Sequence, residues 1–480
     1  MQEQVPKLQR QDPLRLIMKK QPPMVTDAYV YASEKISLEP DAIKQLYNAA
    51  CLPPVRHILA TPDIHVGFGV PIGCVMAMEN AIMPPAVGYD INCGMSMLKT
   101  SFFKDQINLD AVSKTLARNI PLGEGKTNLH LSKKNFESTI IGGVPSIHDL
   151  SKKSNHYAFN NFDEAQFQLD LQHIEEQGKM AADLNAVPQI AIERGVSQLG
   201  TLGGGNHFVE IQYVDQIFDK NLARQFDLSE NQITIMIHSG SRRFGYEIAD
   251  HYMNAAANQP YCSDLSKMLA YIKTETRDGQ NYISAMHAAA NFGFINRYLM
   301  TLIVRECFNE VFGHTEIKLI YDIAHNIAKL ENYQNKPFWV HRKGATRAFG
   351  PKRMKNTVFA ETGQPVITPG SMGTASFLLA ATDNSEQSLC SVNHGAGRVM
   401  SRSAAIGKRK NSKIITPPAI TDDQFKRSMK GIELIAADKS KIKEEAPQAY
   451  KNIDHVVEII AGCKWAIPVA KMRPLVVLKG

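Results

Sequence analysis

Apolar positions recur with helical spacing in three parts of the chain. Residues 41–49 predict a short helix, and residues 163–186 predict an amphipathic helix. The longest helical pattern covers residues 285–312. His287 lies in this last segment among alanines, so we expect it to pack in the core rather than to act chemically.

Short apolar runs bounded by glycine and proline predict buried strands elsewhere. Residues 57–98 alternate such runs with glycine turns, and residues 365–381 read as strand, turn, then strand or helix. Residues 233–243 predict a buried strand that enters a glycine turn, and residues 318–328 a strand that enters a loop. Residues 123–161 are polar and predict a surface insertion.

The composition is that of a globular protein that is not embedded in a membrane. Of 480 residues, 44% are apolar and 21% charged, and no apolar run approaches the roughly 18 residues that span a bilayer. The polar start predicts no secretory signal. The seven cysteines contain no CxxC pair, which is typical of reduced thiols in the cytoplasm. Length alone predicts two or three domains, although no linker or repeat marks a boundary.

The formal net charge of +7 permits a polyanionic partner, although a solvated surface with a slight excess of lysine and arginine is the simpler interpretation. The excess is local. Residues 398–413 hold six lysines and arginines and no acid.

Candidate metal ligands lie in glycine-rich turns and at the ends of apolar runs. Asp90 and Cys93, three residues apart between glycines, can reach one divalent cation, although a buried thiol beside a capping carboxylate is an alternative. His207 follows three glycines, and His238 and His325 each end an apolar run. A single histidine of this kind is more often a core residue, but the five residues together favour a dispersed metal centre. Thiolate and imidazole donors point toward zinc.

The segment NHGAGRVMSR offers a nucleophile. Glycines around His394 keep its ring accessible, and neutral imidazole can attack a nucleotide α-phosphate; a surface histidine in a plain turn is the alternative. Arg398 and Arg402 could hold phosphates. Upstream, Ser371 and Ser376 lie among small residues that allow a ligand to approach closely. The chain has no GxxxxGK[ST] loop, so it is not a P-loop NTPase.

Eight of these segments resemble one known family. From about residue 60 to residue 480 the chain is similar, in order, to the signature segments of the RtcB RNA ligases: PDIHVGFGVPIG, VGYDINCGM, LGGGNHFVE, HSGSRR, HRKGATRA, PGSMGTAS, HGAGRVMSR and RPLVVLKG. The resemblance implies a ligase that joins an RNA 3′-phosphate or 2′,3′-cyclic phosphate end to a 5′-hydroxyl end, in RNA repair or tRNA splicing. It also implies GTP and two manganese ions as cofactors, in place of the zinc that the donor chemistry suggests.

The resemblance assigns a role to each matching residue. His394 would take GMP from GTP, and Asp63 would lie near it. The implied metal ligands are Asp90, Cys93, His207, His238 and His325. The implied guanylate site consists of Asn206, Phe208, Glu210, Ser371, Ser376, Gly395, Ala396, Gly397, Tyr450 and Lys479. Arginines that would meet RNA phosphates are Arg194, Arg242, Arg398 and Arg402.

These positions run from Asp63 to Lys479, so they must converge in one catalytic domain covering residues 1–480. With the predicted elements, this implies a mixed α/β (α+β) fold with central sheets and outer helices. The implied partner is RNA, without a membrane, and an archease-type activator is a candidate partner.

The chain departs from the family at two motifs. HSGSRR continues with Phe-Gly where the family more often reads HSGSRG with Leu-Gly, so Arg243 adds a charge at a turn. Asn393 precedes His394 where cysteine is more usual. Two other functions stay open: a metal-dependent phosphodiesterase or nuclease, which would use the same donors, and a non-catalytic RNA-binding protein.

Overall fold

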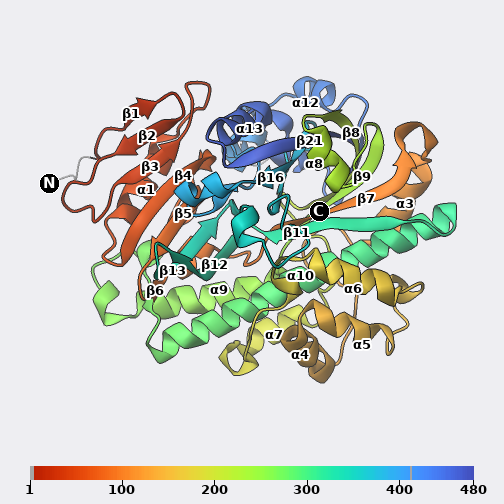
Figure 1. Ribbon diagram of the computed structural model, residues 1–480, viewed down its shortest axis with the longest axis horizontal. Coiled ribbons are helices and arrows are strands. Elements are labelled where there is room, and N and C mark those ends of the chain that lie inside the picture. The colour runs from red at the N-terminus through yellow and green to blue at the C-terminus, as the bar shows by residue number, and fades with distance from the viewer. Residues whose placement is uncertain (1–4, 411–412) are drawn as a thin grey trace.

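The computed structural model describes residues 5–410 and 413–480, which form a mixed α/β fold as predicted. Two large sheets lie side by side, and helices α4 to α7, α9 and α10 gather on one side of them (Figure 1). The helices are α1 (Pro40–Ala50), α2 (Pro84–Val87), α3 (Leu109–Asn119), α4 (Lys133–Gly142), α5 (Ile147–Ser151), α6 (Glu164–Gln172), α7 (Gln189–Gly195), α8 (Lys220–Gln225), α9 (Arg242–Ala257), α10 (Arg277–Phe312), α11 (Arg402–Ile406), α12 (Asp422–Ser428) and α13 (Ile453–Gly462). None of these helices, which are those of the described residues, is long and apolar enough to cross a bilayer.

The first sheet has seven strands in the order β1–β2–β3–β4–β5–β13–β12. These are β1 (Gln9–Asp12), β2 (Arg15–Met18), β3 (Ala28–Tyr31), β4 (Val55–His65), β5 (Ile72–Met78), β13 (Lys336–Lys343) and β12 (Asn326–Tyr333). All neighbours are antiparallel except β3 and β4.

The second sheet has the order β11–β7–β9–β8–β21–β16–β15, and β20 pairs with β21 as an eighth strand. These are β11 (Ile317–Ala324), β7 (Gly94–Phe103), β9 (Gln232–Ser239), β8 (Phe208–Ile217), β21 (Ala466–Lys479), β16 (Ser376–Ala381), β15 (Pro365–Thr368) and β20 (Glu433–Ala436).

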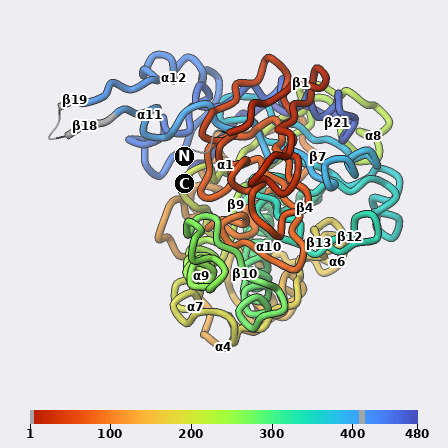
Figure 2. Tube along the Cα trace, turned by 90° about the vertical axis from the view of Figure 1, so that its left-hand side faces the viewer, coloured from red at the N-terminus to blue at the C-terminus, as the bar shows by residue number. Residues whose placement is uncertain are grey.

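Three short two-stranded ladders complete the described sheets. They are β6 (Ala81–Ile82) with β10 (Ile272–Lys273), β14 (Ala345–Arg347) with β17 (Ser391–Asn393), and β18 (Lys408–Lys410) with β19 (Lys413–Thr416). Strands β18 and β19 project from the body of the molecule (Figure 2).

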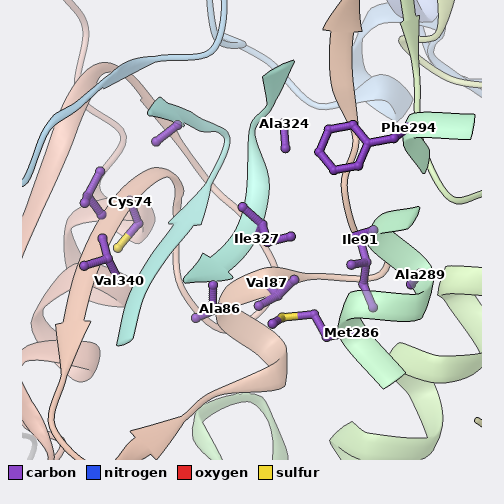
Figure 3. Packing of buried hydrophobic residues seen from close by; sticks show 14 of the residues in the cluster. Cys74, Ala86, Val87, Ile91, Met286, Ala289, Phe294, Ala324, Ile327 and Val340 are labelled. Atoms are coloured by element: carbon purple, nitrogen blue, oxygen red, sulfur yellow. The ribbon is translucent and has the colours of Figure 1, made fainter. Parts of the chain in front are cut away.

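The long helix α10 lies against the core, as its apolar sequence predicts. It begins eight residues before the predicted start because Thr276 caps it by accepting a hydrogen bond from the Gly279 amide at 3.1 Å. It ends at Gly313, whose φ of 81° only glycine adopts readily. Figure 3 shows two of its residues in this core: Met286 lies beside Val87, and Ala289 lies beside Ile91.

One core cluster contains residues of both large sheets and of α10. The two sheets thus belong to one compact unit, and that residues 1–480 form one catalytic domain stays a prediction. Residues 123–161 lie on the outside of the molecule (Figure 1), and several of their apolar side chains, Phe136 and Ile140 among them, are buried in the same cluster. That this segment is an insertion stays a prediction.

The structure corrects two predicted elements. The amphipathic helix expected over residues 163–186 is only α6, because Glu176 and Gln177 adopt positive φ angles of 56° and 52°. Salt bridges hold this turn: Lys329 Nζ lies 2.8 Å from Glu175 and 2.9 Å from Glu176. The strand over residues 318–328 does not enter a loop, because β11 and β12 are separated by His325 alone.

Arg297, in the middle of α10, is fully buried and binds three segments. It pairs with Asp322 on β11 (2.7 and 2.8 Å), and its Nη1 donates to the carbonyls of Asn92 (2.7 Å) and Ser239 (3.0 Å). A buried guanidinium needs such an ion pair and these hydrogen bonds, because an unpaired buried charge costs several kcal/mol.

We predict that Arg297→Met lowers the free energy of unfolding by about 3–5 kcal/mol, because it leaves the Asp322 carboxylate buried without its partner. Urea denaturation followed by circular dichroism measures the change. Arg118→Met, which removes the exposed partner of Glu310, is the matched control and should have little effect. Equal stability of the Arg297 variant and the wild type would contradict the prediction.

Candidate metal centre and nucleotide cleft

Four of the predicted metal ligands lie at one end of four neighbouring strands. Cys93 directly precedes β7, His207 precedes β8, His238 is the penultimate residue of β9, and His325 follows β11. These strands are antiparallel neighbours in the order β11–β7–β9–β8, and their register aligns these ends. Segments far apart in sequence therefore meet at one sheet edge.

The donor atoms form two groups that share Cys93. Cys93 Sγ lies 3.3 Å from His207 Nε2 and 3.2 Å from His238 Nε2. His207 Nε2 lies 2.9 Å from Asp90 Oδ2, and His238 Nε2 lies 3.2 Å from His325 Nε2. Within each group, Asp90–Cys93–His207 and Cys93–His238–His325, all donor atoms lie within 4.8 Å of one another.

The electrostatics of these residues suit a cation. Burial lowers the pKa of His238 and of His325 well below the usual range, so both rings are neutral, which is the ligand form. The Nδ1–H of His238 donates to the Asn206 carbonyl at 2.9 Å, which leaves the Nε2 lone pair directed at the cluster.

Burial disfavours the charged forms of Asp90 and Cys93, the two donors that bind a cation as anions. Burial acts to raise the pKa of Asp90, but the charge of His207 and its hydrogen bond outweigh it and lower that pKa to about 2. Burial, and next the Asp90 charge, raise the pKa of the Cys93 thiol well above its usual range. A bound divalent cation would lower the pKa of this thiol again, because it stabilises the thiolate. Converging neutral imidazoles around a thiol and a carboxylate thus fit one or two such ions.

Asp63 and His394 are hydrogen-bonded to each other next to this cluster. The Nδ1–H of His394 donates to Asp63 Oδ2 at 2.6 Å, and the His394 amide donates to the same oxygen at 3.2 Å. Burial acts to raise the pKa of Asp63, but its hydrogen bond with His394 and the charge of that ring hold the pKa below the usual value. The His394 and His325 rings lie 5.0 Å apart, centroid to centroid.

Close backbone packing explains two glycines around His394. A Cβ on Gly397, whose φ is 73°, would lie 2.2 Å from the carbonyl oxygen of Asp63. A Cβ on Gly344, at φ 60°, would lie 3.1 Å from the His394 ring. Both positions exclude side chains, so the loop closes tightly around the histidine.

A cleft of about 970 Å³ contains this site. All five predicted metal ligands line it, with His394 and Asn206. Other predicted residues that line it are Gly395, Ala396, Gly397, Arg398, Arg402 and Tyr450. The remaining predicted guanylate residues do not line it and are at most 5% exposed: Phe208, Glu210, Ser371, Ser376 and Lys479.

These buried residues are nevertheless adjacent to the cleft. Lys479 ends β21 opposite Phe208 on β8, and its Nζ donates to Asn206 Oδ1 at 2.9 Å. Gln212 Nε2 donates to both Glu210 (2.7 Å) and Ser376 (3.2 Å). Burial raises the pKa of Glu210 to about 7 and lowers that of Lys479 to about 8.

The four predicted arginines are not equivalent. Arg398 and Arg402 lie at the cleft. Arg242 is half-buried outside the cleft lining, where its Nη2 donates to the Gly123 carbonyl at 3.1 Å and its Nε to Thr201 at 3.2 Å. Arg194 is exposed at the end of α7 and is not among the cleft residues.

Sequence reasoning missed Glu445, which is 4% exposed and binds both cleft arginines, Arg398 and Arg402. Its carboxylate accepts from Arg398 at 3.0 Å, from Arg402 at 2.7 Å and from the Tyr450 hydroxyl. It lies in KIKEEAPQ, which has neither a glycine turn nor an apolar run, so no local signal could have indicated it.

Comparisons with known proteins agree with this geometry. Residues 45–480 match the family model described as tRNA-splicing ligase RtcB. The chain is 40% identical to "tRNA-splicing ligase RtcB" of Methanococcus maripaludis over 94% of both chains, and 38% identical to the protein of that name from Thermococcus kodakarensis over the full length of both. It is 37% identical to "RNA-splicing ligase RtcB homolog 1" of Entamoeba dispar, over 92% of this chain and 82% of that protein. The chain belongs to the RtcB family.

Proposed function

We propose that this protein is an RNA ligase that uses GTP and Mn²⁺ to join an RNA 3′-phosphate or 2′,3′-cyclic phosphate end to a 5′-hydroxyl end through a guanylylated His394. One observation carries the proposal: His394 is oriented by Asp63 beside a group of five metal-type donors, in one cleft. The names of the relatives, tRNA-splicing and RNA-splicing ligases, support the substrate class.

His394 would act as the nucleophile. Because Asp63 accepts the Nδ1–H, the lone pair is on Nε2, which is the atom free to attack. Attack on the α-phosphorus of GTP forms an N–P bond, breaks the bond from that phosphorus to the bridging oxygen, and releases pyrophosphate. Asp63 stabilises the positive charge that develops on the ring.

Two transfers would follow. An oxygen of the RNA 3′-phosphate attacks the same phosphorus and breaks the N–P bond, which forms an anhydride between RNA and GMP and returns His394 to its neutral form. The 5′-hydroxyl oxygen of the second strand then attacks the RNA phosphorus, GMP leaves, and the hydroxyl proton passes to solvent or to a nearby base. A cyclic phosphate end first takes up water to open to the 3′-phosphate.

Two metal positions follow from the donor groups. Asp90, Cys93 and His207 would hold one ion, and Cys93, His238 and His325 the other, with the thiolate shared. Bound Mn²⁺ would neutralise phosphate charge and align the reacting oxygens. Manganese is proposed from the family resemblance, since the donors alone would suit zinc.

The remaining predicted site residues, in the cleft and around it, would hold the nucleotide and the RNA. The proposed guanylate residues are Asn206, Phe208, Glu210, Ser371, Ser376, Gly395, Ala396, Gly397, Tyr450 and Lys479. The proposed phosphate contacts are Arg194, Arg242, Arg398 and Arg402. We also propose that the enzyme acts in the cytoplasm on RNA, in repair or tRNA splicing, with an archease-type activator as a candidate partner.

The test of the proposal is transfer of labelled GMP to the protein. Incubation with α-³²P-GTP and Mn²⁺, followed by denaturing electrophoresis, should give an acid-labile label on the wild type and none on His394→Ala, because that variant lacks the Nε2 nucleophile that Asp63 orients beside the metal-type donors. His251→Ala, on the exposed side of α9, is the control and should keep the label. A folded, metal-loaded wild type without label would refute the ligase mechanism and favour a phosphodiesterase or nuclease.

Cys93→Ala should lower the number of tightly bound Mn²⁺ ions from two to at most one, since both donor groups lose a ligand. Metal analysis after gel filtration gives the number directly. Cys74→Ala removes another buried thiol, on β5, and should leave metal content unchanged. Retention of two ions by the Cys93 variant would contradict the shared-ligand arrangement.

Lys479→Met should lower the rate of GMP labelling by about 100-fold or more, because it removes a cation from the nucleotide pocket and the hydrogen bond to Asn206. Methionine fills much of the same buried volume, so the fold should persist. Lys471→Met makes the same change on the same strand, outside the cleft lining, and should label normally. If the Lys479 variant is labelled at the rate of the wild type, Lys479 does not contribute to the nucleotide site.

A further inference from the structure

A group of aromatic side chains lies at the rim of the cleft. Tyr89 and Tyr246 are stacked, with ring centroids 4.8 Å apart and planes inclined by 19°. Phe68 packs on Tyr89 at 5.5 Å, and the Arg243 guanidinium lies 4.7 Å from the centre of the Tyr246 ring. We call Phe68, Tyr89, Tyr246 and Arg243 the rim stack.

The rim stack adjoins the metal centre. Tyr89 lines the cleft and directly precedes Asp90 in the chain. Tyr246 and Arg243 lie on the first turns of α9, which begins immediately after the turn that follows His238. The Ser241 amide in that turn donates to Asp90 at 3.1 Å, so the start of α9 is attached to a proposed metal ligand.

The outer part of the rim stack is open to solvent yet held in place. Tyr246 is 37% exposed and the Arg243 side chain 50% exposed. Arg243 is fixed at both ends: its amide donates to Gln198 at 3.1 Å, and its guanidinium pairs with Glu247 at 2.8 Å. Spacings of three and four residues place Tyr246 and Glu247 on the same helix face as Arg243.

An exposed tyrosine ring that is stacked on a second ring and paired with an arginine forms a flat surface on which a planar ligand can pack. Single-stranded RNA is read by stacking of its bases on aromatic rings and on arginine planes. The stack continues into a cleft that is lined by Arg398 and Arg402, which favours a polyanionic RNA strand over a protein partner.

We infer that the rim stack is a binding surface for a nucleobase of an RNA strand whose end lies in the cleft, with the base packed on the exposed surface of Tyr246 and Arg243. The inference rests on the proposed function and adds a contact outside the reacting groups. Arg243 is the residue at which HSGSRR departs from the usual HSGSRG, so this contact would be a feature of this chain rather than of the family pattern.

The test measures stacking directly. RNA oligonucleotides that carry a 3′-phosphate or a 5′-hydroxyl end, with 2-aminopurine at successive positions, are titrated with Mn²⁺-loaded protein without GTP, and fluorescence quenching and affinity are recorded. For the wild type we expect strong quenching at one position near the end of one strand. Tyr246→Ala should abolish that quenching and weaken binding about tenfold, whereas Tyr246→Phe should retain both. Arg243→Ala should weaken binding to a smaller extent.

Phe218→Ala is the matched control. Phe218 is 46% exposed and stacked on Phe377 at 6.0 Å, but it follows the far end of β8 from His207, so its loss should not change RNA binding. Melting temperatures near that of the wild type show that each variant is folded.

Unchanged quenching and affinity in Tyr246→Ala would overturn the inference and leave a protein partner as the use of this surface. Equal losses in Tyr246→Ala and Phe218→Ala would overturn it as well. GMP labelling of the same wild-type preparation distinguishes failure of this inference from failure of the proposed function. A protein that is labelled but shows no quenched position refutes only the base-binding role of the rim stack. An unlabelled protein refutes the proposed function.

Discussion

The buried Arg297 guanidinium is the contact on which the geometry of the cleft depends. It donates to Asn92, between Asp90 and Cys93, and to Ser239, next to His238. It also pairs with Asp322, three residues before His325 on β11. One side chain thus fixes the backbone beside three donor segments. The desolvation of such a charge is costly, and it is offset here because both partners of the ion pair are hydrogen-bonded on several sides.

The cleft forms where the two large sheets meet. The eight-stranded sheet presents Cys93, His207 and His238 at one edge, and His325 is the single residue through which the chain passes to the seven-stranded sheet. The seven-stranded sheet supplies Asp63, near the end of β4, and the β14–β17 ladder brings His394 to it. Each sheet contributes a different chemical group, the metal-type donors or the oriented histidine, so neither half of the fold has a complete site without the other.

Local patterns in the sequence were sufficient for some of this arrangement. Glycine turns and apolar runs that end in histidine indicated the five donors, and the structure brings those side chains together. The presence of α10, its end at Phe312 and the strand nature of residues 233–239 also followed from apolar patterning. The family resemblance, rather than the pattern, pointed to Asp63. The sequence failed to predict features that depend on contacts between residues distant in the chain. Residues 173–186 read as a continuation of α6, but Lys329 and Arg347 draw Glu175 and Glu176 inward and the helix stops. Arg297 lies in an apolar helix and Glu445 in a polar loop, so neither position carries a signal by itself.

The ion pairs of Glu445 with Arg398 and Arg402 fix the cations that a polyanion would meet at the cleft. Glu445 holds Arg398 and Arg402 in fixed positions, and these two arginines, after Lys479, help to keep the pKa of its buried carboxyl below the usual value. These ion pairs order both guanidinium groups, which lowers the entropic cost of gripping a phosphate. Arg398 also donates to the carbonyls of Met400 and Glu444, whereas Arg402 pairs with Glu445 through its Nε, so Arg402 keeps more of its five donors for a phosphate. On the proposed function, an RNA phosphate would add to this pairing without breaking it, because removal of Glu445 from its partners would leave a buried carboxylate unpaired. The same reasoning explains why the acidic residue lies behind the arginines: from there it positions them without repelling the substrate at the mouth of the cleft.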